Sequence, residues 1–511
     1  MERRVRVRYA PSPTGPQHMG GVRTALYNYL LAKKHGGDFI LRIEDTDQNR
    51  YVPGAEEYII ESLKWCGIEP NEGVGFGDGP YAPYRQSERK PMYREYADRL
   101  LASGDAYIAF DTAEELDQMR ESMKAQGVPN PQYNSISRQY MKNSISLPAD
   151  EVEKRLAAGE PYVIRFKMPR NEEVKFHDVI RNWVSFNTSQ LDDKVLMKND
   201  GMPTYHLANV VDDYLMKISH VIRGEEWLSS APLHVLLYKA FGWENEMPAF
   251  AHLSLILKPD GNGKLSKRDG DRLGFPSFPL SWKDPETAEL STGYRERGYL
   301  PEAFINFISL LGWNPGNDIE LMSKEELIQY FSLEKVHKSG ARFDFEKAKW
   351  FNQQYIKKMD DGDLANQLLP SLEAKGYKVD LEYAKEYCRL MKDRAVFLSD
   401  LPDVGYYFFE DIMTFDTETV KKKYTDQVKD KLAGLVGFID SAEKFDAAHV
   451  EAIVKQFITD NGFKMGDIMP LLRIALAGTM QGPPIFDMIQ LLGKERALDR
   501  LQKSFIFFDT I

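Results

Sequence analysis

Cysteine is nearly absent from this sequence, which has only Cys66 and Cys388 in 511 residues. Two cysteines so far apart cannot build a disulfide framework or a cysteine-rich zinc site, so we expect a reducing compartment. Long apolar runs are also missing, because no stretch approaches the roughly 20 residues that span a bilayer. The first residues, MERRVRVRYAPSPTG, include arginines but no apolar stretch of signal-peptide length. These absences predict a cytoplasmic protein that does not enter a membrane.

An excess of basic charge is missing as well, since the formal net charge is −11. Local lysine and arginine fields hold a polyanion, so this average predicts a confined nucleic-acid face at most and an acidic surface elsewhere. Hydrophobic residues make up 43% and charged residues 28% of the chain, which argues against a disordered protein. Because single cores stop growing at roughly 250–300 residues, the length predicts several domains.

The first 50 residues predict a strand, a loop, a helix and a second strand. Residues 5–9 alternate apolar and basic side chains, and the turn-rich PSPTGPQ follows them. Apolar residues then recur at helical spacing over 22–30, and Gly36-Gly37 ends that helix. Residues 39–43 form the second strand. This order is typical of a βαβ unit and predicts a parallel sheet.

The rest of the chain predicts an insertion, a second half of the sheet and a helical region. Residues 89–204 mix helical stretches with the strand-like YVIRFKM and VSFN, which indicates a separate α+β part. A strand at 218–222 and an amphipathic helix at 231–241 resume the α/β pattern. From about residue 300 onward the apolar spacing is almost wholly helical.

The string PSPTGPQHMGG carries the first candidate site. His18, Gly20 and Gly21 fall at the start of the predicted helix, and helix N-termini favour phosphates. Gly20 allows a nucleotide to approach closely because no Cβ intrudes, and His18 can donate a hydrogen bond to a phosphate oxygen. A tight turn with an incidental histidine would explain HxGG alone, but not the whole string.

The loop GKLSKRDG carries the second candidate site. Lys264, Lys267 and Arg268 place three cations within five residues, where they can gather around a triphosphate and stabilise charge moving onto pyrophosphate. A solvated surface loop is the usual alternative for a short basic cluster. The two motifs together, each next to one half of the sheet, are more specific than either alone.

These motifs resemble those of the class I aminoacyl-tRNA synthetases. HMGG (18–21) resembles their "HIGH" motif, and KLSKR (264–268) resembles their "KMSKS" loop. The similarity is greatest to the bacterial glutamyl-tRNA synthetases and runs from Arg8 to LLGKERAL (491–498). It includes the strings RYAPSPTG, LRIEDTD (41–47), PYRQSER (83–89), DGMPTYHLANVVDD (200–213) and VIRGEEW (221–227).

The resemblance implies ATP-dependent ligation of L-glutamate to the 3′-terminal adenosine of tRNA(Glu). The glutamate α-carboxylate would attack the α-phosphorus of ATP, giving glutamyl-adenylate and diphosphate. The terminal 2′-hydroxyl of the tRNA would then take the glutamyl group and release AMP. No covalent enzyme intermediate is required, so catalysis would be positioning and charge stabilisation. Mg²⁺ would accompany ATP, and activation is expected to depend on bound tRNA.

Free glutamate has two carboxylates and one ammonium, so a selective pocket needs two arginines and an acceptor. The resemblance places Glu44 on the ammonium and Arg8 and Arg223 on the carboxylates, in either assignment. Glutamine would leave one arginine facing a neutral amide, so no editing site is needed. The implied glutamate-binding residues are Arg8, Ala10, Ser12, Glu44, Tyr205, Asn209 and Arg223. The implied ATP-binding residues are His18, Gly20, Gly21, Lys264, Ser266, Lys267 and Arg268, with His18, Lys264 and Lys267 as catalytic candidates.

The predicted fold class is a multidomain α/β protein with a Rossmann-type parallel-sheet catalytic domain, an α+β insertion and all-α C-terminal anticodon-binding domains. The expected domains are a catalytic domain in two halves (1–88 and 205–258), a connective acceptor-binding insertion (89–204), a basic-loop and stem-contact domain (259–340) and two helical anticodon-binding domains (341–418 and 419–511).

Two stretches depart from the family pattern. Some members hold a structural zinc with Cys and His in the insertion, but the corresponding residues 106–116 contain neither, so no zinc is expected. Segment 271–298 looks longer than usual, and its Pro and Gly content predicts an extra surface excursion.

Arg394 aligns with the arginine that reads the third anticodon base in enzymes restricted to tRNA(Glu); an ordinary helix-surface arginine is the alternative.

Several alternatives stay open at this stage. A glutaminyl-tRNA synthetase shares the catalytic core but usually carries β-barrel anticodon domains, and a non-discriminating glutamyl enzyme would charge both tRNAs. A truncated glutamyl-queuosine enzyme would lack the helical domains. A non-catalytic RNA-binding protein would have lost His18, Gly20 or Lys267, and another nucleotidyltransferase would need no dicarboxylate pocket. Family precedent favours a monomer whose partners are tRNA(Glu), glutamate and ATP.

Overall fold

The computed structural model describes residues 3–511, and the side chains of Lys267, Arg268 and Asp271 lie outside the described residues. The chain forms two compact units. The first contains Met1–Glu296 and Pro301–Lys347, and the second contains Arg297–Leu300 and Ala348–Ile511. Within residues 3–511, no helix combines the length and the apolar character that a membrane crossing requires.

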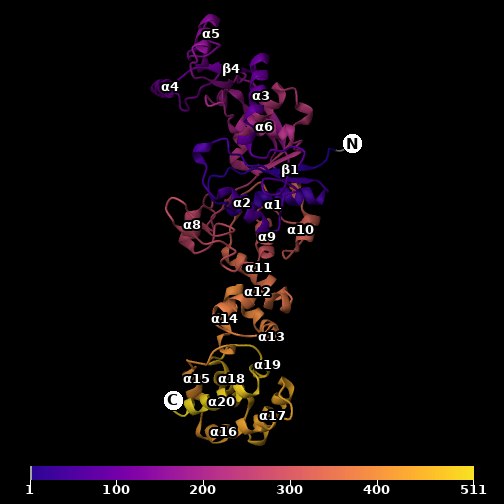
Figure 1. Ribbon diagram of the computed structural model, residues 1–511. Helices are drawn as coiled ribbons and strands as arrows, with labels where there is room; N and C mark the ends of the chain where they lie inside the picture. The colour runs from indigo at the N-terminus through magenta and orange to yellow at the C-terminus, as the bar shows by residue number, and fades with distance from the viewer. Residues whose placement is uncertain (1–2) are drawn as a thin grey trace. The chain divides into compact units, whose positions relative to one another are not determined.

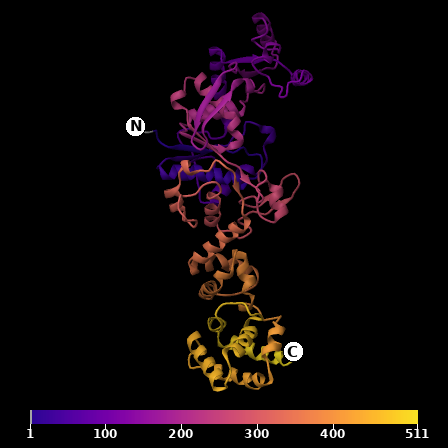
Figure 2. The ribbon, with the colours of Figure 1, turned by 180° about the vertical axis from the view of Figure 1, so that it is seen from behind.

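A mainly parallel sheet in two parts forms the centre of the first unit (Figures 1 and 2). The backbone N–H of Ser219 donates to the carbonyl of Arg6 at 2.8 Å, so the two parts adjoin there. The first part has the order β1 (Arg6–Tyr9), β2 (Asp38–Leu41) and β3 (Glu72–Gly73). The second part has the order β9 (His220–Gly224), β10 (Ala249–Leu253), β6 (Glu173–Asp178) and antiparallel β7 (Asn182–Asn187).

The junction of β1 and β9 is the point at which the strand order changes direction, because the chain runs from β1 towards β3 on one side and from β9 towards β10 on the other. In open α/β sheets, ligands bind outside the carboxyl ends of the strands at such a point. The predicted two-half parallel sheet is therefore present. The residues that follow Tyr9 and Gly224 lie at its expected ligand-binding point.

Helix α1 (Met19–Lys34) follows β1 and is buried along most of its length. Val22, Leu26 and Leu30 are fully buried, as their helical spacing predicts. The helix ends before Gly36, which has a positive φ of 59° that a residue without Cβ adopts at low cost. Because α1 packs on the sheet, its first turn is held at the carboxyl end of β1.

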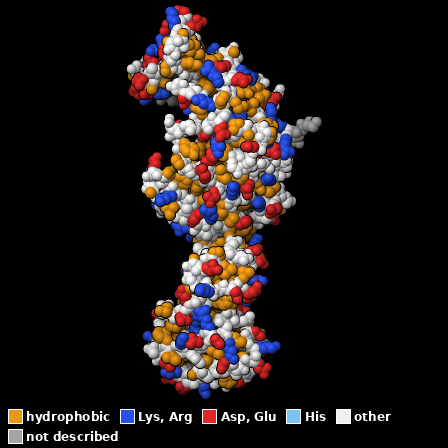
Figure 3. All heavy atoms as spheres, in the orientation of Figure 1, with side chains coloured by type: hydrophobic (Ala, Val, Ile, Leu, Met, Phe, Trp, Pro, Cys, Tyr) orange, Lys and Arg blue, Asp and Glu red, His pale blue; other side chains and the backbone are white. Residues whose placement is uncertain are grey.

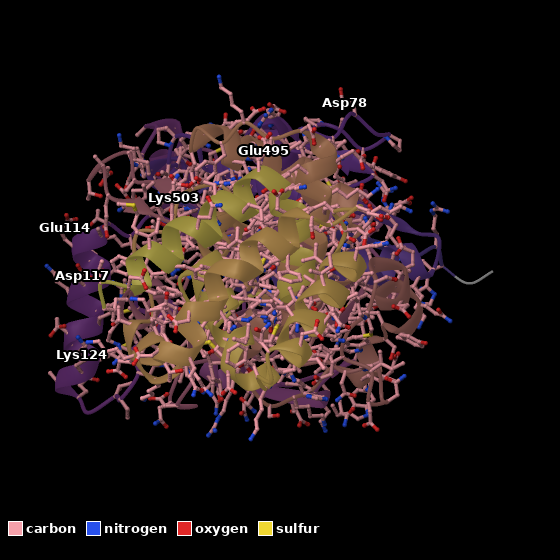
Figure 4. All side chains as sticks on the ribbon, turned by 90° about the horizontal axis from the view of Figure 1, so that it is seen from below. Asp78, Glu114, Asp117, Lys124, Glu495 and Lys503 are labelled. Atoms are coloured by element: carbon pink, nitrogen blue, oxygen red, sulfur yellow. The ribbon has the colours of Figure 1, made fainter. Side chains whose placement is uncertain are left out.

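The insertion has its own antiparallel sheet, made of β4 (Ala106–Ala109), β5 (Val163–Phe166) and β8 (Val195–Met197), with helices α4 (Ala113–Ala125) and α5 (Ala149–Ala157). No residue of α4 is buried, and Figure 4 shows Glu114, Asp117 and Lys124 extending outward from it. One part of the expected insertion behaves differently. Strands β6 and β7 extend the central sheet, because Phe176 packs on Phe250 and Asp178 pairs with the same residue.

Segment 271–298 is in part the surface excursion that its Pro and Gly content predicts, and in part a buried segment. Residues 275–280 are buried, whereas 272–274, 285–290 and 295–297 are exposed. Phe278, Leu280 and Trp282 join Tyr58 in a buried cluster, and the Tyr58 hydroxyl donates to the carbonyl of Leu280 at 2.5 Å. The aromatic side chains explain the buried part, since Phe278 and Trp282 each bury a large apolar surface against the protein.

The remaining elements of the first unit are α2 (Ala55–Trp65), α3 (Lys90–Ser103), α6 (Tyr205–Leu215), α7 (Ala231–Ala240), β11 (Ile256–Leu257), α8 (Lys267–Leu273), β12 (Trp282–Lys283), β13 (Leu290–Ser291), α9 (Pro301–Ser309), α10 (Lys324–Tyr330) and β14 (Ala341–Arg342). Its surface carries both signs of charge, and Figure 3 shows lysines and arginines interspersed with acidic side chains on one face.

The second unit is helical throughout its described residues, as predicted. Aspartates accept hydrogen bonds from the first turns of several of its helices, including Asp360, Asp380 and Asp446. Its helices are α11 (Phe345–Lys358, which begins in the first unit), α12 (Asp361–Ala374), α13 (Leu381–Met391), α14 (Leu401–Val404), α15 (Thr417–Lys423), α16 (Asp426–Asp440), α17 (Ala447–Asp460), α18 (Met465–Ala477), α19 (Ile485–Leu492) and α20 (Lys494–Phe508).

Candidate active site

A cavity of about 880 Å³ opens at the carboxyl ends of β1 and β9. Both sequence motifs contribute to its lining, so the two candidate sites share one cleft. The predicted residues that line it are Arg8, Ala10, Ser12, His18, Gly20, Gly21, Glu44, Tyr205, Asn209, Arg223, Lys264 and Ser266. Lys267 and Arg268 begin α8 directly after Ser266, but their side chains lie outside the described residues.

His18 is the N-cap of α1. The backbone N–H of Gly20 donates to His18 Nδ1 at 3.2 Å, which places the proton of the neutral ring on Nε2. Burial and the nearby charge of Lys264 lower the pKa of His18 to about 4, so the ring is neutral at physiological pH. Nε2 is buried without a hydrogen-bond partner among the described residues. The ring therefore offers a neutral N–H donor at the cavity wall.

Gly20 and Gly21 differ in what surrounds them. A Cβ on Gly21 would lie 2.7 Å from the Tyr9 hydroxyl, so the fold itself excludes a side chain there. A Cβ on Gly20 would meet only ordinary contacts, the nearest being His18 Nδ1 at 3.6 Å. Packing within the protein therefore does not require glycine at position 20, and the reason lies in what enters the cavity.

The basic loop is held at its base and open at its lysine. Leu265 is buried, and its N–H donates to the carbonyl of Ile256 at 2.9 Å. Ser266 forms a capping box with Asp269, which fixes the first turn of α8. The Lys264 side chain is 59% exposed and has Glu226 at 3.5 Å. The loop thus presents a weakly held cation next to the donor face of His18.

Acidic and basic side chains alternate at the buried end of the cavity. Arg8 donates to Asp213 through Nε at 2.9 Å and through Nη2 at 3.2 Å. Arg42 bridges Asp213 and Glu44 at 2.7 and 2.9 Å. Burial raises the pKa of Asp213 and the charges of Arg8 and Arg42 lower it, with a net lowering. Arg8 thus lines the cavity with its charge already balanced by Asp213.

Glu44 follows β2 and receives hydrogen bonds on one oxygen only. Arg42 Nη2 and Asn209 Nδ2 both donate to Oε1, at 2.9 and 3.1 Å. Burial raises the pKa of Glu44, against the opposing charges of Arg42 and Arg8. The second carboxylate oxygen has no hydrogen-bond partner among the described residues, and it is the natural acceptor for a ligand ammonium.

Arg223, at the end of β9, is 5% exposed, and its hydrogen-bond partners among the described residues are all neutral. Its Nη1 donates to the Tyr205 hydroxyl at 2.7 Å and its Nε donates to His252 Nε2 at 3.0 Å. Its Nη2 donates to the carbonyl of Trp227 at 3.3 Å. A buried guanidinium without a direct carboxylate partner is costly, so this position favours binding of an anionic ligand.

The sequence motifs did not identify three aromatic residues of the cavity wall. Trp227 packs on Tyr205 with ring centroids 4.3 Å apart, and Phe278 and Trp282 line the cavity from the segment after the basic loop. For Phe278 and Trp282, the clustering of aromatic residues in a Pro- and Gly-rich stretch was the available signal, because such side chains seldom remain exposed together.

Arg394 lies in the second unit, at the end of the 3₁₀ turn Lys392–Arg394 that follows α13, and is exposed. Its Nη2 donates to the carbonyl of Gly482 at 2.7 Å, in the loop between α18 and α19. Arg473 contacts the same loop through the carbonyl of Pro483 at 2.9 Å. The predicted anticodon contact therefore stands beside a second arginine, at a loop that joins two helices.

The cavity offers few side chains that could hold a metal ion. The described residues contain no group of three or more His, Cys, Asp or Glu side chains arranged to hold a metal ion. The carboxylates that line the cavity are Glu44, Glu226 and Asp284. Glu44 is bonded to Arg42 and Asn209, and Glu226 lies beside Lys264. This donor set suits a Mg²⁺ ion that is held by nucleotide phosphates and water.

Comparison with known proteins gives the same picture. The family described as "tRNA synthetases class I (E and Q), catalytic domain" matches residues 4–350, and the "Anticodon binding domain" matches residues 363–505. The chain is 56% identical to a protein of Amoebophilus asiaticus named glutamate–tRNA ligase, covering 99% of this chain and 98% of the relative. It is 55% identical to a protein of the same name from Porphyromonas gingivalis, covering 99% of each.

Two solved structures share the whole architecture. One is a glutamate tRNA ligase from Elizabethkingia meningosepticum in complex with its amino acid, with a TM-score of 0.94 and 52% identity over 98% of this chain and 99% of that one. The other is a glutamate-tRNA synthetase from Elizabethkingia anophelis, with a TM-score of 0.91 and 52% identity over 98% and 100%. The chain therefore belongs to the class I tRNA synthetases of the E and Q type.

Proposed function

We propose that this chain is a glutamate–tRNA ligase. It uses ATP to join L-glutamate to the 3′-terminal adenosine of tRNA(Glu) through glutamyl-adenylate, and it releases AMP and diphosphate. The observation that carries the proposal is the buried Arg223, which has no direct carboxylate partner and lies in the same cavity as His18 and Lys264. The names of relatives 55–56% identical over nearly the full chain support the same function.

Glutamate binds at the buried end of the cavity. Arg8 and Arg223 serve its two carboxylates, and Glu44 accepts the ammonium through its unoccupied oxygen. Tyr205 and Asn209 hold Arg223 and Glu44 in place, while Ala10 and Ser12 complete the wall. Glutamine would leave a guanidinium against an amide, which costs several kcal/mol and explains rejection without editing.

ATP binds at the open end, over the first turn of α1. His18 donates its Nε2 proton to a phosphate oxygen, and Gly20 and Gly21 let the nucleotide lie against the helix N-terminus. Lys264, Ser266, Lys267 and Arg268 gather around the triphosphate and stabilise the charge that moves onto diphosphate. Mg²⁺ enters with ATP and supplies further charge neutralisation there.

The tRNA binds through the insertion and the helical domains. The expected domain boundaries give the acceptor end to residues 89–204 and the anticodon to 341–511, and the anticodon family match at 363–505 supports the second. Arg394 reads the third anticodon base in this proposal, which makes the enzyme selective for tRNA(Glu). We also propose that it works as a monomer in the cytoplasm without structural zinc; Cys66 and Cys388, both free and buried, suit a reducing compartment.

ATP–diphosphate exchange tests the proposal directly. The assay compares glutamate with glutamine, each with and without tRNA(Glu). We expect exchange with glutamate in the presence of tRNA and exchange at least about 100-fold weaker with glutamine, because the lost ionic contact is worth several kcal/mol. Equal exchange with both amino acids would remove the glutamate-specific assignment, and glutamine-preferring exchange would favour the glutaminyl alternative.

A further inference from the structure

Behind Arg223 lies a pair of buried side chains that the reaction does not use. His252 and Asp178 are both 0% exposed, and His252 Nδ1 lies 2.6 Å from Asp178 Oδ2. The other oxygen of Asp178 accepts the N–H groups of Ile180 and Arg181 at 3.0 and 2.9 Å. The carboxylate is thus fixed in position, and it receives the Nδ1 proton of the imidazole.

The hydrogen bonds determine the tautomer of each ring around Arg223. An arginine has only donors, so His252 Nε2 must accept from Nε at 3.0 Å, which agrees with a proton on Nδ1. His234 Nδ1 lies 3.4 Å from Arg223 Nη1 and must accept as well. The proton of His234 is then on Nε2, which faces His206 Nδ1 at 3.3 Å. Two neutral imidazole acceptors therefore hold the guanidinium.

The two arginines of the pocket are balanced in different ways. Arg8 shares two hydrogen bonds with the carboxylate of Asp213. Among the described side chains, no carboxylate bonds to Arg223, and the ring of His252 stands between Arg223 and the carboxylate of Asp178. A carboxylate placed directly on Arg223 would compete with a substrate carboxylate, whereas an imidazole fixes the geometry and leaves the positive charge in place.

We infer that His252, held in one tautomer by Asp178 and assisted by His234, is the positioning residue that keeps the Arg223 guanidinium oriented and electrostatically available for a glutamate carboxylate. This inference rests on the proposed function. It adds to that function a reason for the preference of carboxylate over amide, located in residues that do not touch the substrate. The pKa values of His252 and His234 are both lowered, mainly by burial, so both rings stay neutral acceptors.

Asp178→Asn tests the inference with little change in shape. The amide can donate to His252 Nδ1, so the ring proton moves to Nε2 and an N–H then faces the N–H of Arg223. Exchange kinetics in the presence of tRNA should show a roughly 10- to 100-fold higher KM for glutamate, since a hydrogen bond to a charged group is lost. The KM for ATP should stay within about twofold, and the preference for glutamate over glutamine should fall.

A matched pair at position 252 separates positioning from structural support. His252→Gln keeps an oxygen that can accept from Arg223 Nε and should retain most of the affinity for glutamate. His252→Leu has a similar volume without an acceptor and should raise the KM for glutamate as Asp178→Asn does. Equal losses in both variants, or equal rises in the KM of glutamate and ATP, would overturn the positioning role.

Arg223→Ala distinguishes a wrong glutamate pocket from a wrong positioning role for His252. If Arg223→Ala leaves the KM for glutamate unchanged, the pocket of the proposed function is wrong. If Arg223→Ala raises that KM but Asp178→Asn and His252→Leu do not, the pocket stands and the positioning inference alone is refuted. Circular dichroism and the Tm of each variant identify any that fail to fold, and the Asp178 and His252 variants provide independent readings.

Discussion

The two ends of the cavity are built in different ways. At the glutamate end, Arg223 is 5% exposed and each of its nitrogens has a partner, while Arg8 and Glu44 belong to a buried network of charges. At the ATP end, the Lys264 side chain is 59% exposed, and a Cβ on Gly20 would meet only ordinary van der Waals contacts. One end is fixed before any ligand arrives, and the other consists of a helix N-terminus and an exposed loop.

The difference matches what each end must do. Selection of a small dicarboxylic amino acid requires rigid charges at defined positions, because the discrimination comes from groups left unpaired when the wrong ligand binds. Transfer of a nucleotidyl group requires donors that meet charge as it develops on the phosphates. Substitutions at the glutamate end should therefore act on affinity for glutamate, and loss of a charged donor at the ATP end should act mainly on the rate.

The largest effect is expected for Lys267→Ala. Lys267 begins α8 in the basic loop, and the loss of one charge-stabilising donor should lower adenylate formation about 10³-fold. Diphosphate exchange with tRNA present measures the rate, and the Tm should not change. Arg272→Ala is the control, because Arg272 lies later in the same helix and is exposed. Near-normal exchange in the Lys267 variant would remove its catalytic role.

A smaller loss, about 100-fold in kcat/KM for glutamate, is expected for Arg223→Ala, with the KM for ATP changed by less than about threefold. The reason is that Arg223 lies in the glutamate end, where it holds the uncompensated charge. Titration of each substrate in the exchange assay gives both constants. Similar losses for the two substrates would mean that the cavity is not divided as proposed.

The adjacent glycines give the sharpest comparison at the ATP end. Gly20→Ala should leave the Tm unchanged and raise the KM for ATP roughly tenfold, because the new methyl group enters the space of the nucleotide. Gly21→Ala should destabilise the protein by about 1–2 kcal/mol, because the methyl group meets the Tyr9 hydroxyl. Thermal unfolding and exchange kinetics distinguish the two. A lower Tm for Gly20→Ala would mean that packing within the protein, not the nucleotide, requires glycine at position 20.

The smallest effect is expected in the second unit. Arg394→Gln should change the charging ratio between tRNAs with CUC and CUG anticodons by a few-fold, about 1 kcal/mol of discrimination. Aminoacylation of the two transcripts measures this ratio. Arg389→Gln is the control, since Arg389 is nearby on α13 and pairs with Glu386. An unchanged ratio in the Arg394 variant would mean that another residue reads the third base.

The sequence predicted the parts of this site that depend on local order. The loop and helix that carry His18, and the strand ends that carry Arg8 and Arg223, follow from short-range patterns and a family resemblance. The contact between Asp178 and His252 does not, because 74 residues separate them and His252 lies in an apolar run that resembles any core strand. The pairing of β6 with β10 was missed for the same reason.

Segment 271–298 shows a second kind of limit. Its prolines and glycines correctly indicated turns, but turn residues do not say which side of the backbone faces the protein. The contacts of Leu280 with Tyr58 were decisive, and they join residues that are 222 positions apart. Local composition predicted the turns of this segment. Long-range packing determined that part of it lines the cavity.

The junction between β1 and β9 has a consequence for synthesis of the protein. Arg6 and Ser219 join the two halves of the sheet. The strand ends that carry the cavity therefore come together only after the ribosome has made residues far beyond the first motif. His18 and Glu44 leave the exit tunnel long before Arg223 and Lys264. With the site as proposed, a nascent chain that has not yet released residue 266 lacks part of the cavity lining, so binding of both substrates becomes a sign that the cavity is assembled.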